Sequence, residues 1–291
     1  MRSPSAVSIA LALLSTWLIW GSTYLAIRFG VEDIPPFMMA STRFLIAGGL
    51  MFAWLKWRGE PLPSRQQARN AAVIGLMMLA GGNGAVTYAE QQISSGVAAL
   101  GVAIVPLLTV LVARFWGHHS SRLEWLGILV GFAGIVMLNL GASLKASPAG
   151  AALLIFAAAI WAVASVWGKY LELPKGLMSS AIQMLAAGAA LALLSVVCGE
   201  RLTAMPSWKA IGSLAYLTVL GSMIAYSAFS FLLLHVRPAL ASSYAYVNPM
   251  VAVFLGWWLG GEHIGAAEVG AMLTILTAVA IVVLQQVRGK G

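Results

Sequence analysis

The sequence predicts an all-α, polytopic membrane protein of ten transmembrane helices, arranged as two inverted five-helix repeats. Three observations support this prediction. The chain is 60% hydrophobic and only 9% charged, its apolar residues form long blocks, and its basic residues cluster between those blocks. A typical soluble chain carries roughly 25% charged residues. Because about 20 apolar residues in a helix match the thickness of a bilayer, membrane helices explain the blocks better than barrel strands do.

Ten apolar segments follow one another, separated by charges and prolines. Their expected bounds are 7–30, 35–55, 70–91, 95–117, 123–142, 148–169, 176–198, 209–234, 238–260 and 265–287. The first segment is too long for the core of a cleaved signal, and its polar middle "WGST" is unlike one, so it is expected to remain as a helix. The loops are short, which leaves no room for a sizeable soluble domain.

The basic residues predict the direction of the helices. Of the 17 Lys and Arg residues, twelve fall on one side of the predicted helices and four on the other, with Arg43 inside the second segment. Positively charged loops stay in the cytoplasm. Both termini are therefore expected there, in a multi-pass protein of the bacterial inner membrane. The same topology explains the net charge of +8 without a nucleic-acid partner.

The chain contains an internal repeat. A shift of about 142 residues pairs rare residues of the two halves: Trp20 with Trp161, Asn83 with Tyr226, Thr87 with Ser230, Pro106 with Pro249, and Gly127, Gly131 and Gly134 with Gly270, Thr274 and Thr277. We expect repeats at 1–142 and 148–287, followed by a short basic tail, 288–291. Five helices per copy make the second copy enter the membrane in the opposite direction. Secondary transporters have such inverted repeats, with substrate sites near the midplane between the halves.

Small residues mark one face of the fifth and tenth segments. Gly127, Gly131 and Gly134 lie three or four residues apart, so they share a helix face. Small faces allow helix backbones to approach closely, either inside one chain or between two copies. The sequence leaves both readings open, and the predicted state is a monomer or a weak homodimer.

Two passages resemble a known family. They are "WGSTYLAIRFGVEDIPPFMMASTRFLIAGG", from residue 20 to 49, and "GSMIAYSAFSFLLLHVRPALASSYAYVNPMVAVFLGWWLGGEHIGAAEVG", from 221 to 270. With Trp-Gly-Ser at the first helix, Arg43 in the second, and Gly261 and Glu262 after the ninth, the chain resembles EamA-type members of the drug/metabolite transporter superfamily. These are bacterial inner-membrane exporters of amino acids and other metabolites. The first half departs from the pattern, because His119 stands where the second half has Glu262.

The resemblance implies ten helices in two inverted repeats. It also implies a central cavity lined mainly by the first, third, fourth, sixth, eighth and ninth helices. It does not reveal the substrate.

Polar and aromatic residues recur four apart on these helices, and residues four apart share a helix face. The predicted substrate-binding residues are Trp20, Tyr24, Asn83, Thr87, Trp161, Ser165, Tyr226, Ser230, Tyr244 and Asn248. Taken singly, a Ser or Thr of this kind bonds to its own helix, and a Trp or Tyr anchors a helix at the interface. Their matched positions in both repeats favour a cavity.

The two repeats differ where the fourth segment reads "GVAALGVAIVP" and the ninth reads "ALASSYAYVNP". The ninth places Tyr244, Tyr246 and Asn248 where the fourth has small or apolar residues such as Gly101. The second repeat is therefore expected to supply hydrogen bonds to the substrate, and the first repeat is expected to leave the space that the substrate occupies. The paired prolines in these segments, at 106 and 249, are predicted to act as hinges or gates, or else as static kinks.

The predicted function is secondary transport. Lys, Asp and Glu are missing from the middles of the apolar segments, which favours a small zwitterionic or amphipathic solute over a strongly charged one. We expect export of amino acids, aromatic ones included, by alternating access. The alternative is an uptake or exchange carrier for nucleosides, sugars or other metabolites in the same superfamily. An intramembrane enzyme is a remote alternative, because the sequence shows neither a nucleophile with its base nor paired acids.

Glu90, near the end of the third segment, is a candidate for energy coupling or else a solvated end charge. No metal or cofactor is expected, since the chain has one cysteine, Cys198, and its four histidines lack zinc-ligand spacing. The expected partners are a small-molecule substrate and the lipid bilayer.

Overall fold

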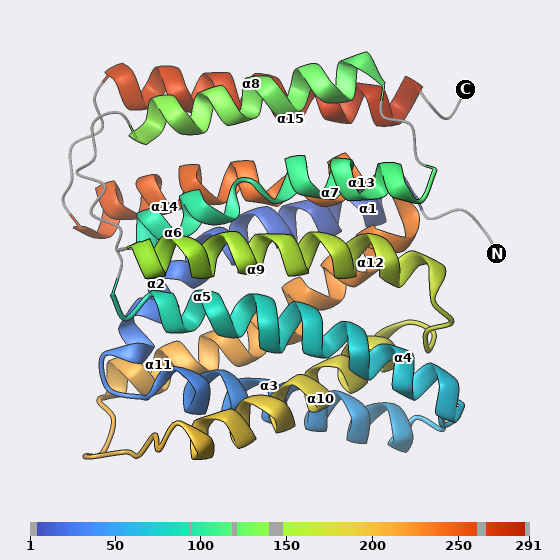
Figure 1. The fold of residues 1–291 in the computed structure, drawn as a ribbon, viewed down its shortest axis with the longest axis vertical. Coiled ribbons are helices and arrows are strands. Elements are labelled where there is room, and N and C mark those ends of the chain that lie inside the picture. The colour runs from blue at the N-terminus through green and yellow to red at the C-terminus, as the bar shows by residue number, and fades with distance from the viewer. Residues whose placement is uncertain (1–4, 93–94, 118–120, 140–147, 261–265, 289–291) are drawn as a thin grey trace.

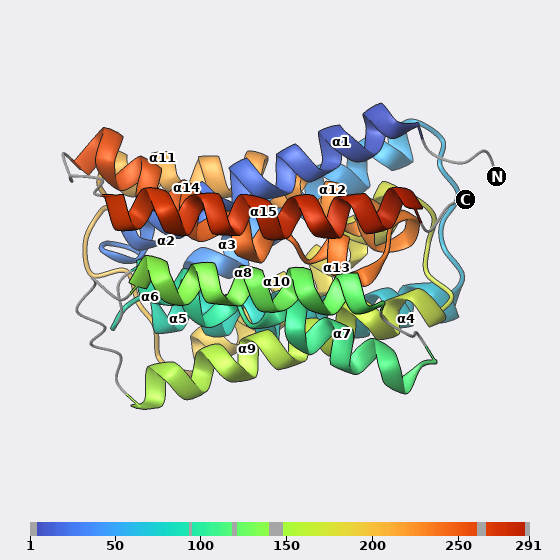
Figure 2. The ribbon, with the colours of Figure 1, turned by 90° about the horizontal axis from the view of Figure 1, so that it is seen from above.

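The computed structural model describes residues 5–92, 95–117, 121–139, 148–260 and 266–288. All regular structure in these ranges is helical, as predicted. Long helices lie side by side in layers, and α1 begins at the same end of the bundle at which α15 ends (Figure 1 and Figure 2). We call this the termini end. His119, Gly261, Glu262 and the tail beyond Arg288 lie outside the described residues.

The elements follow the predicted segments in order. The first repeat contains α1 (Ala6–Leu14), η1 (Ser15–Ile19), α2 (Trp20–Val31), α3 (Pro36–Trp57), α4 (Arg65–Gly75), η2 (Leu76–Asn83), α5 (Gly84–Ala89), α6 (Ser95–Val102), α7 (Val105–Phe115) and α8 (Arg122–Asn139). The second contains α9 (Pro148–Trp167), η3 (Gly168–Tyr170), α10 (Leu177–Val197), α11 (Trp208–Tyr216), η4 (Leu217–Tyr226), α12 (Ser227–His235), α13 (Pro238–Ala241), α14 (Tyr244–Gly260) and α15 (Ala266–Arg288).

Within the described residues, six continuous helical stretches are long and apolar enough to cross a membrane. They are Ala6–Val31, Pro36–Trp57, Arg65–Ala89, Ala152–Tyr170, Leu177–Val197 and Trp208–His235. The fourth and ninth predicted segments are broken into shorter helices. The number of ten crossings therefore stays a prediction.

Three of the long stretches contain π-helical segments, which the sequence pattern did not reveal. These are η1, η2 and η4, in the first, third and eighth predicted helices. Segments η2 and η4 end at Asn83 and Tyr226, which the repeat makes equivalent, and Trp20 directly follows η1. A π-helical turn changes the direction of the side chains that follow it and often marks a functional site.

Helices that the repeat makes equivalent pack against each other along their lengths: α3 against α10, and α8 against α15 (Figure 1). Glycine allows the first pair to approach closely, because a Cβ added at Gly48 would lie 2.9 Å from the carbonyl oxygen of Ala181. The Glu200 carboxylate, which follows α10, accepts hydrogen bonds from the α3 backbone at Phe37 (3.1 Å) and Met38 (2.8 Å). A carboxylate in this position stabilises a helix N-terminus. The two repeats are thus held together through equivalent helices.

The small face of α8 packs inside the chain at Gly131, where an added Cβ would lie 3.1 Å from the Tyr246 ring. On α15, a Cβ added at Gly270 would meet no described atom within 4 Å. The contact at Gly131 explains part of the glycine pattern by packing within one chain. The oligomeric state stays a prediction.

The two repeat-equivalent prolines lie in different local structures. Pro106 is in the first turn of α7, just after a break at residues 103–104, where a missing N–H costs no helical hydrogen bond. Pro249 lies inside α14, and the break in this segment comes earlier, at Ser242 and Ser243. Their proposed role as hinges stays a prediction.

At the end of the bundle opposite the termini end, charged side chains of one loop contact the start of a neighbouring helix. The Asp33 carboxylate accepts a hydrogen bond from the Ser207 backbone N–H at 2.9 Å, ahead of α11. Hydrogen bonds from Ser207 hold the pKa of Asp33 below its ordinary value. Close by, Lys209 pairs with Glu32 at 3.1 Å. These contacts connect the loop after α2 to the start of α11.

Candidate functional site

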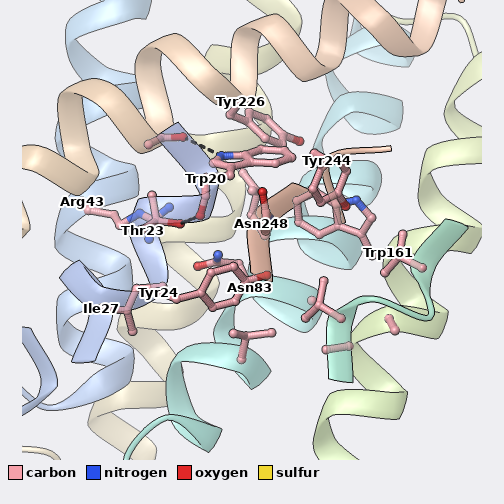
Figure 3. A pocket seen from close by; sticks show the side chains of 18 of the residues that line it. Trp20, Thr23, Tyr24, Ile27, Arg43, Asn83, Trp161, Tyr226, Tyr244 and Asn248 are labelled. Carbon is pink, nitrogen blue, oxygen red and sulfur yellow. Dashed lines mark hydrogen bonds between the residues drawn. The ribbon is translucent and has the colours of Figure 1, made fainter. Parts of the chain in front are cut away.

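A pocket lies at the centre of the bundle, between helices of both repeats. Its walls come from α2, α3, η2, α5, α6, α7, α9, η4 and α14. Seven of the predicted substrate-binding residues line it: Trp20, Tyr24, Asn83, Trp161, Tyr226, Tyr244 and Asn248 (Figure 3). The pocket also contains Thr23, Ile27 and Arg43, which the sequence did not assign to the site.

One wall of the pocket is a cluster of aromatic rings around Trp20. The Trp20 ring lies 4.8 Å from Tyr244 and 5.6 Å from Trp161 in edge-on contacts, and 5.0 Å from Phe229. Its indole Nε1 donates a hydrogen bond to the Gly221 carbonyl at 3.1 Å. Edge-on aromatic pairs prefer such spacings and are worth about 0.5–1.5 kcal/mol beyond burial. The cluster, formed by Trp20, Trp161, Phe229 and Tyr244, is a firm apolar wall.

Four polar atoms around the pocket are buried without a hydrogen-bond partner among the described residues. They are Arg43 Nη1, Trp161 Nε1, and both Asn248 amide atoms, Nδ2 and Oδ1. The Tyr24 hydroxyl lies beside the Asn248 amide, but not in hydrogen-bonding geometry (Figure 3). An unsatisfied buried group costs about 1–3 kcal/mol, so native proteins contain few of them. Four of the nine such atoms in the described residues belong to the lining of this pocket, which makes it the candidate site for a polar ligand.

Arg43 supplies the positive charge of the pocket. Its side chain is 3% exposed, its Nε donates to Ser222 Oγ at 3.0 Å, and its guanidinium lies 4.5 Å from the Phe44 ring centroid. An arginine inside an apolar segment often forms a structural ion pair or extends its side chain to the membrane surface. Arg43 instead lines the central pocket. A lone cation inside an apolar segment was the signal that could have identified it.

Glu90, the candidate coupling residue, is not solvated. It is 2% exposed, and neither carboxylate oxygen has a hydrogen-bond partner among the described residues. It does not line the pocket, but Arg28 and Arg43 lie near enough to interact with it electrostatically. The alternative of a solvated end charge is therefore wrong, while its role in coupling stays a prediction.

The central pocket contains little free space. Its free volume is about 60 Å³, room for a few water molecules, whereas pockets for organic ligands occupy roughly 300–1,000 Å³. A solute of amino-acid size needs the walls to move apart. The structure therefore represents a compact state of the site.

Three predicted residues lie elsewhere. Ser165 and Ser230 line a second cavity near the termini end. Thr87 is fully buried, and its hydroxyl donates to the Asn83 carbonyl of its own helix at 2.9 Å. Ser165 also bonds within its helix, to the Trp161 carbonyl at 2.7 Å.

Two expectations about how the fourth and ninth predicted helices differ are wrong. Gly101 does not leave open space, because a Cβ added there would lie 2.5 Å from Leu154 of α9. Tyr246 faces away from the pocket, with its ring beside Gly131 and its hydroxyl 3.5 Å from the Ile128 carbonyl oxygen of α8. Room on the first-repeat side is instead bounded by Val102 and Val105.

Comparisons with known proteins agree with this architecture. The model of the EamA-like transporter family matches residues 7–140 and 148–284. The Escherichia coli (strain K12) protein called "Uncharacterized inner membrane transporter YedA" is 50% identical over 274 residues, which cover 94% of this chain and 90% of that protein. "Uncharacterized transporter YoaV" of Bacillus subtilis is 25% identical, covering 86% and 88%. A crystal structure 24% identical in sequence superposes with a TM-score of 0.80, covering 99% of this chain and all of the other.

Proposed function

This chain belongs to the EamA-like transporter family, and we propose that it is an inner-membrane secondary transporter that exports amino acids, aromatic ones included. Transport proceeds through the central pocket by alternating access. The location is supported by the inner-membrane name of the 50% identical relative and by the apolar helices of this chain.

The observation that carries the proposal is the set of unpartnered polar atoms around an apolar, aromatic pocket. Their chemistry fits an amino acid. Arg43 Nη1 and Asn248 Nδ2 are donors suited to a carboxylate, and Asn248 Oδ1 is an acceptor suited to an ammonium group. The faces of Trp20 and Trp161 suit an apolar side chain or the ammonium itself. Hydrogen bonds would then fix the orientation of the bound amino acid, and the aromatic rings would limit the size of its side chain.

The charge of the pocket favours a solute with one carboxylate over a phosphorylated one. Among the lining residues Arg43 is the cationic one, whereas a phosphate is usually held by several cationic or backbone donors. A zwitterion adds no net charge to such a pocket.

The proposal is tested by counterflow in proteoliposomes loaded with single unlabelled solutes. Labelled phenylalanine, tryptophan and leucine should accumulate well above protein-free vesicles, and uridine and glucose should not. Asn248→Ala should reduce phenylalanine counterflow about tenfold or more, as expected for a lost hydrogen bond in a buried site. The matched control is Trp258→Phe on the same helix, because Trp258 is 67% exposed and away from the pocket. Accumulation of uridine or glucose without any amino acid would overturn the proposed substrate class.

A further inference from the structure

A second cavity opens near the termini end of the bundle, among α4, η2, α9, α10 and α12. Its free volume is about 310 Å³, about five times that of the central pocket and within the range of organic-ligand sites. Apolar side chains form much of the wall. The polar groups that line it include Lys169, Ser179, Gln183, Ser227, Ser230 and His235.

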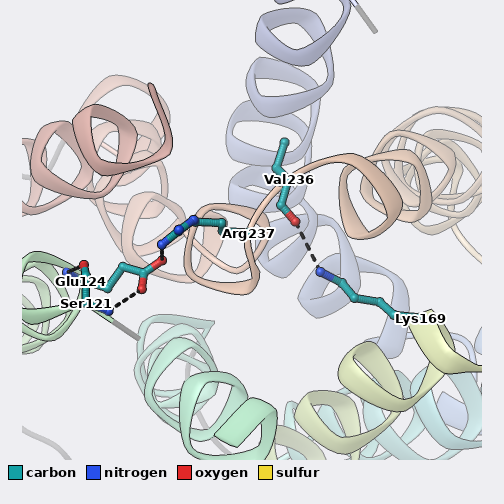
Figure 4. Close-up of polar contacts among 5 residues, drawn as sticks. All are labelled: Ser121, Glu124, Lys169, Val236 and Arg237. Atoms are coloured by element: carbon teal, nitrogen blue, oxygen red, sulfur yellow. Dashed lines mark hydrogen bonds and ion pairs between the residues drawn. The ribbon is translucent and has the colours of Figure 1, made fainter. Parts of the chain in front are cut away.

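Lys169 is half-buried in η3, directly after α9, and lines this cavity. Its Nζ donates one hydrogen bond, to the Val236 carbonyl at the end of α12, at 3.2 Å (Figure 4). An ammonium group has three donors. No acceptor for the other two is found among the described residues. Lys169 therefore presents two N–H donors and a positive charge at the cavity wall.

The charges around Lys169 do not neutralise it. Its neighbour Arg237 pairs with Glu124 at 3.1 Å, and the Glu124 carboxylate also accepts from the Ser121 N–H (Figure 4). Glu172, three residues away in sequence, accepts a hydrogen bond from Gln67 at 3.3 Å. Within the described part of the chain, Lys169 forms no ion pair. A half-buried cation without a counter-ion favours an anionic ligand.

Hydroxyl groups add to this preference. The Ser227 Oγ is buried without a hydrogen-bond partner among the described residues, and Ser230 lines the same cavity. His235 lines the same cavity and uses Nδ1 toward the Phe231 carbonyl at 2.7 Å. Neutral hydroxyls and one ammonium suit a single carboxylate, and the apolar remainder of the wall suits its organic part.

One layer of side chains separates this cavity from the central pocket. Gln183 and Met78 line the second cavity, and Tyr226 lines the central one. The Tyr226 hydroxyl donates to Gln183 Oε1 and lies 3.8 Å from Met78 Sδ. The two cavities therefore lie in series along the bundle.

We propose that the second cavity is a binding site for small organic carboxylates, held by Lys169 together with Ser227 and Ser230, at the entrance to the central pocket. Its role as the entry point of the transported solute rests on the proposed function. Carboxylate binding itself does not.

The test measures the local charge with a cysteine reporter and needs no known substrate. Ser230→Cys is made in a Cys198→Ser background, which removes the chain's single native cysteine. The purified full-length protein reacts with an anionic methanethiosulfonate, the sulfonatoethyl reagent, or with a cationic one, the trimethylammonioethyl reagent. The measured quantity is the ratio of the anionic to the cationic rate. Effects on thiol reactivity cancel in this ratio.

Lys169→Gln should lower the ratio about fivefold, because a unit charge that lines the same cavity as the thiol acts in opposite directions on the two reagents. Lys169→Arg should keep the parent ratio. The matched control, Lys175→Gln, removes the same charge from an exposed position and should change the ratio less than about twofold. An unchanged ratio in Lys169→Gln, or an equal change in Lys175→Gln, would overturn the proposal.

A second measurement asks whether a bound ligand protects the reporter cysteine from labelling, and it leaves Lys169 unchanged. 3-Phenylpropionate should slow labelling of Ser230→Cys, whereas the uncharged 3-phenyl-1-propanol should not. Equal protection by both probes, or by neither, would contradict a carboxylate site. If Ser230→Cys does not fold, Leu234→Cys at the same cavity replaces it as the reporter. Protection by 3-phenylpropionate together with absent amino-acid counterflow would refute the proposed function and leave this site standing.

Discussion

Replacing Asn248 by leucine should stabilise the empty protein and impair transport at the same time. The Asn248 side chain is 1% exposed in α14, and both amide atoms lack partners among the described residues. A buried amide without hydrogen bonds lowers the stability of the ligand-free protein. Leucine has nearly the same shape as asparagine and has no polar group that needs a hydrogen bond.

The magnitude follows from the two unbonded groups. Each unsatisfied polar group costs about 1–3 kcal/mol, and residual contact with the Tyr24 hydroxyl reduces the sum, so we expect a gain of about 1–3 kcal/mol in stability. For a chain of this size, 1 kcal/mol corresponds to roughly 2–4 °C in unfolding temperature. The lost substrate hydrogen bonds are of the same size. Transport should fall by about tenfold or more, since 1.4 kcal/mol is a factor of ten.

The assay pairs thermal denaturation in detergent, followed by monomer yield at a fixed heating rate, with counterflow of phenylalanine. The fixed rate matters because membrane proteins of this kind unfold irreversibly. The control is Ser242→Ala in the preceding break, because its hydroxyl already bonds the Pro238 carbonyl at 2.9 Å. A lower denaturation temperature for Asn248→Leu would show that the amide is bonded in the empty protein. Unimpaired transport would show that it does not bind the solute.

Three further predictions use neighbouring features. Tyr244→Phe should reduce transport severalfold and Tyr246→Phe should not, because Tyr244 lines the pocket and Tyr246 packs against α8; equal effects in the counterflow assay would contradict this placement. Glu90→Gln should abolish any dependence of transport on an imposed pH gradient, since Glu90 is a buried carboxylate without a partner in the described residues; an unchanged dependence removes its coupling role. Reporter fusions after Gly59 should report the cytoplasm and after Arg201 the periplasm, and the reverse pattern would refute the predicted topology.

The sequence predicted most of the polar and aromatic residues that line the central pocket, because three patterns coincided. Residues four apart share a helix face, the repeat carries each pair to a matching helix, and the resemblance names the helices that line a cavity. Trp20 and Trp161 illustrate this, since the repeat pairs them and their rings meet 5.6 Å apart in the pocket wall. Their positions are fixed by helix geometry, which a sequence pattern describes well.

Some errors arise because one turn of helix also moves a residue about 5–6 Å along the helix axis. Trp161 and Tyr226 line the central pocket, whereas Ser165 and Ser230, each four residues later, line the second cavity. Gly101 and Tyr246 lie close to the breaks after α6 and α13, which alter the side-chain direction relative to a continuous helix. The pattern of apolar residues contains no signal for these breaks.

In the proposed transport cycle, a solute must pass through the layer of side chains that separates the two cavities. The layer between the two cavities contains Tyr226, bonded to Gln183 and close to Met78, and the Tyr226 ring contacts Trp161 edge-on. These residues come from η2, α9, η4 and α10, so a passage through the layer requires helices of both repeats to separate. Separation breaks the edge-on ring contact, worth about 0.5–1.5 kcal/mol, together with one buried hydrogen bond. A solute that satisfies the unpartnered atoms of Asn248 and Arg43 offsets a cost of that size, which couples solute binding to opening.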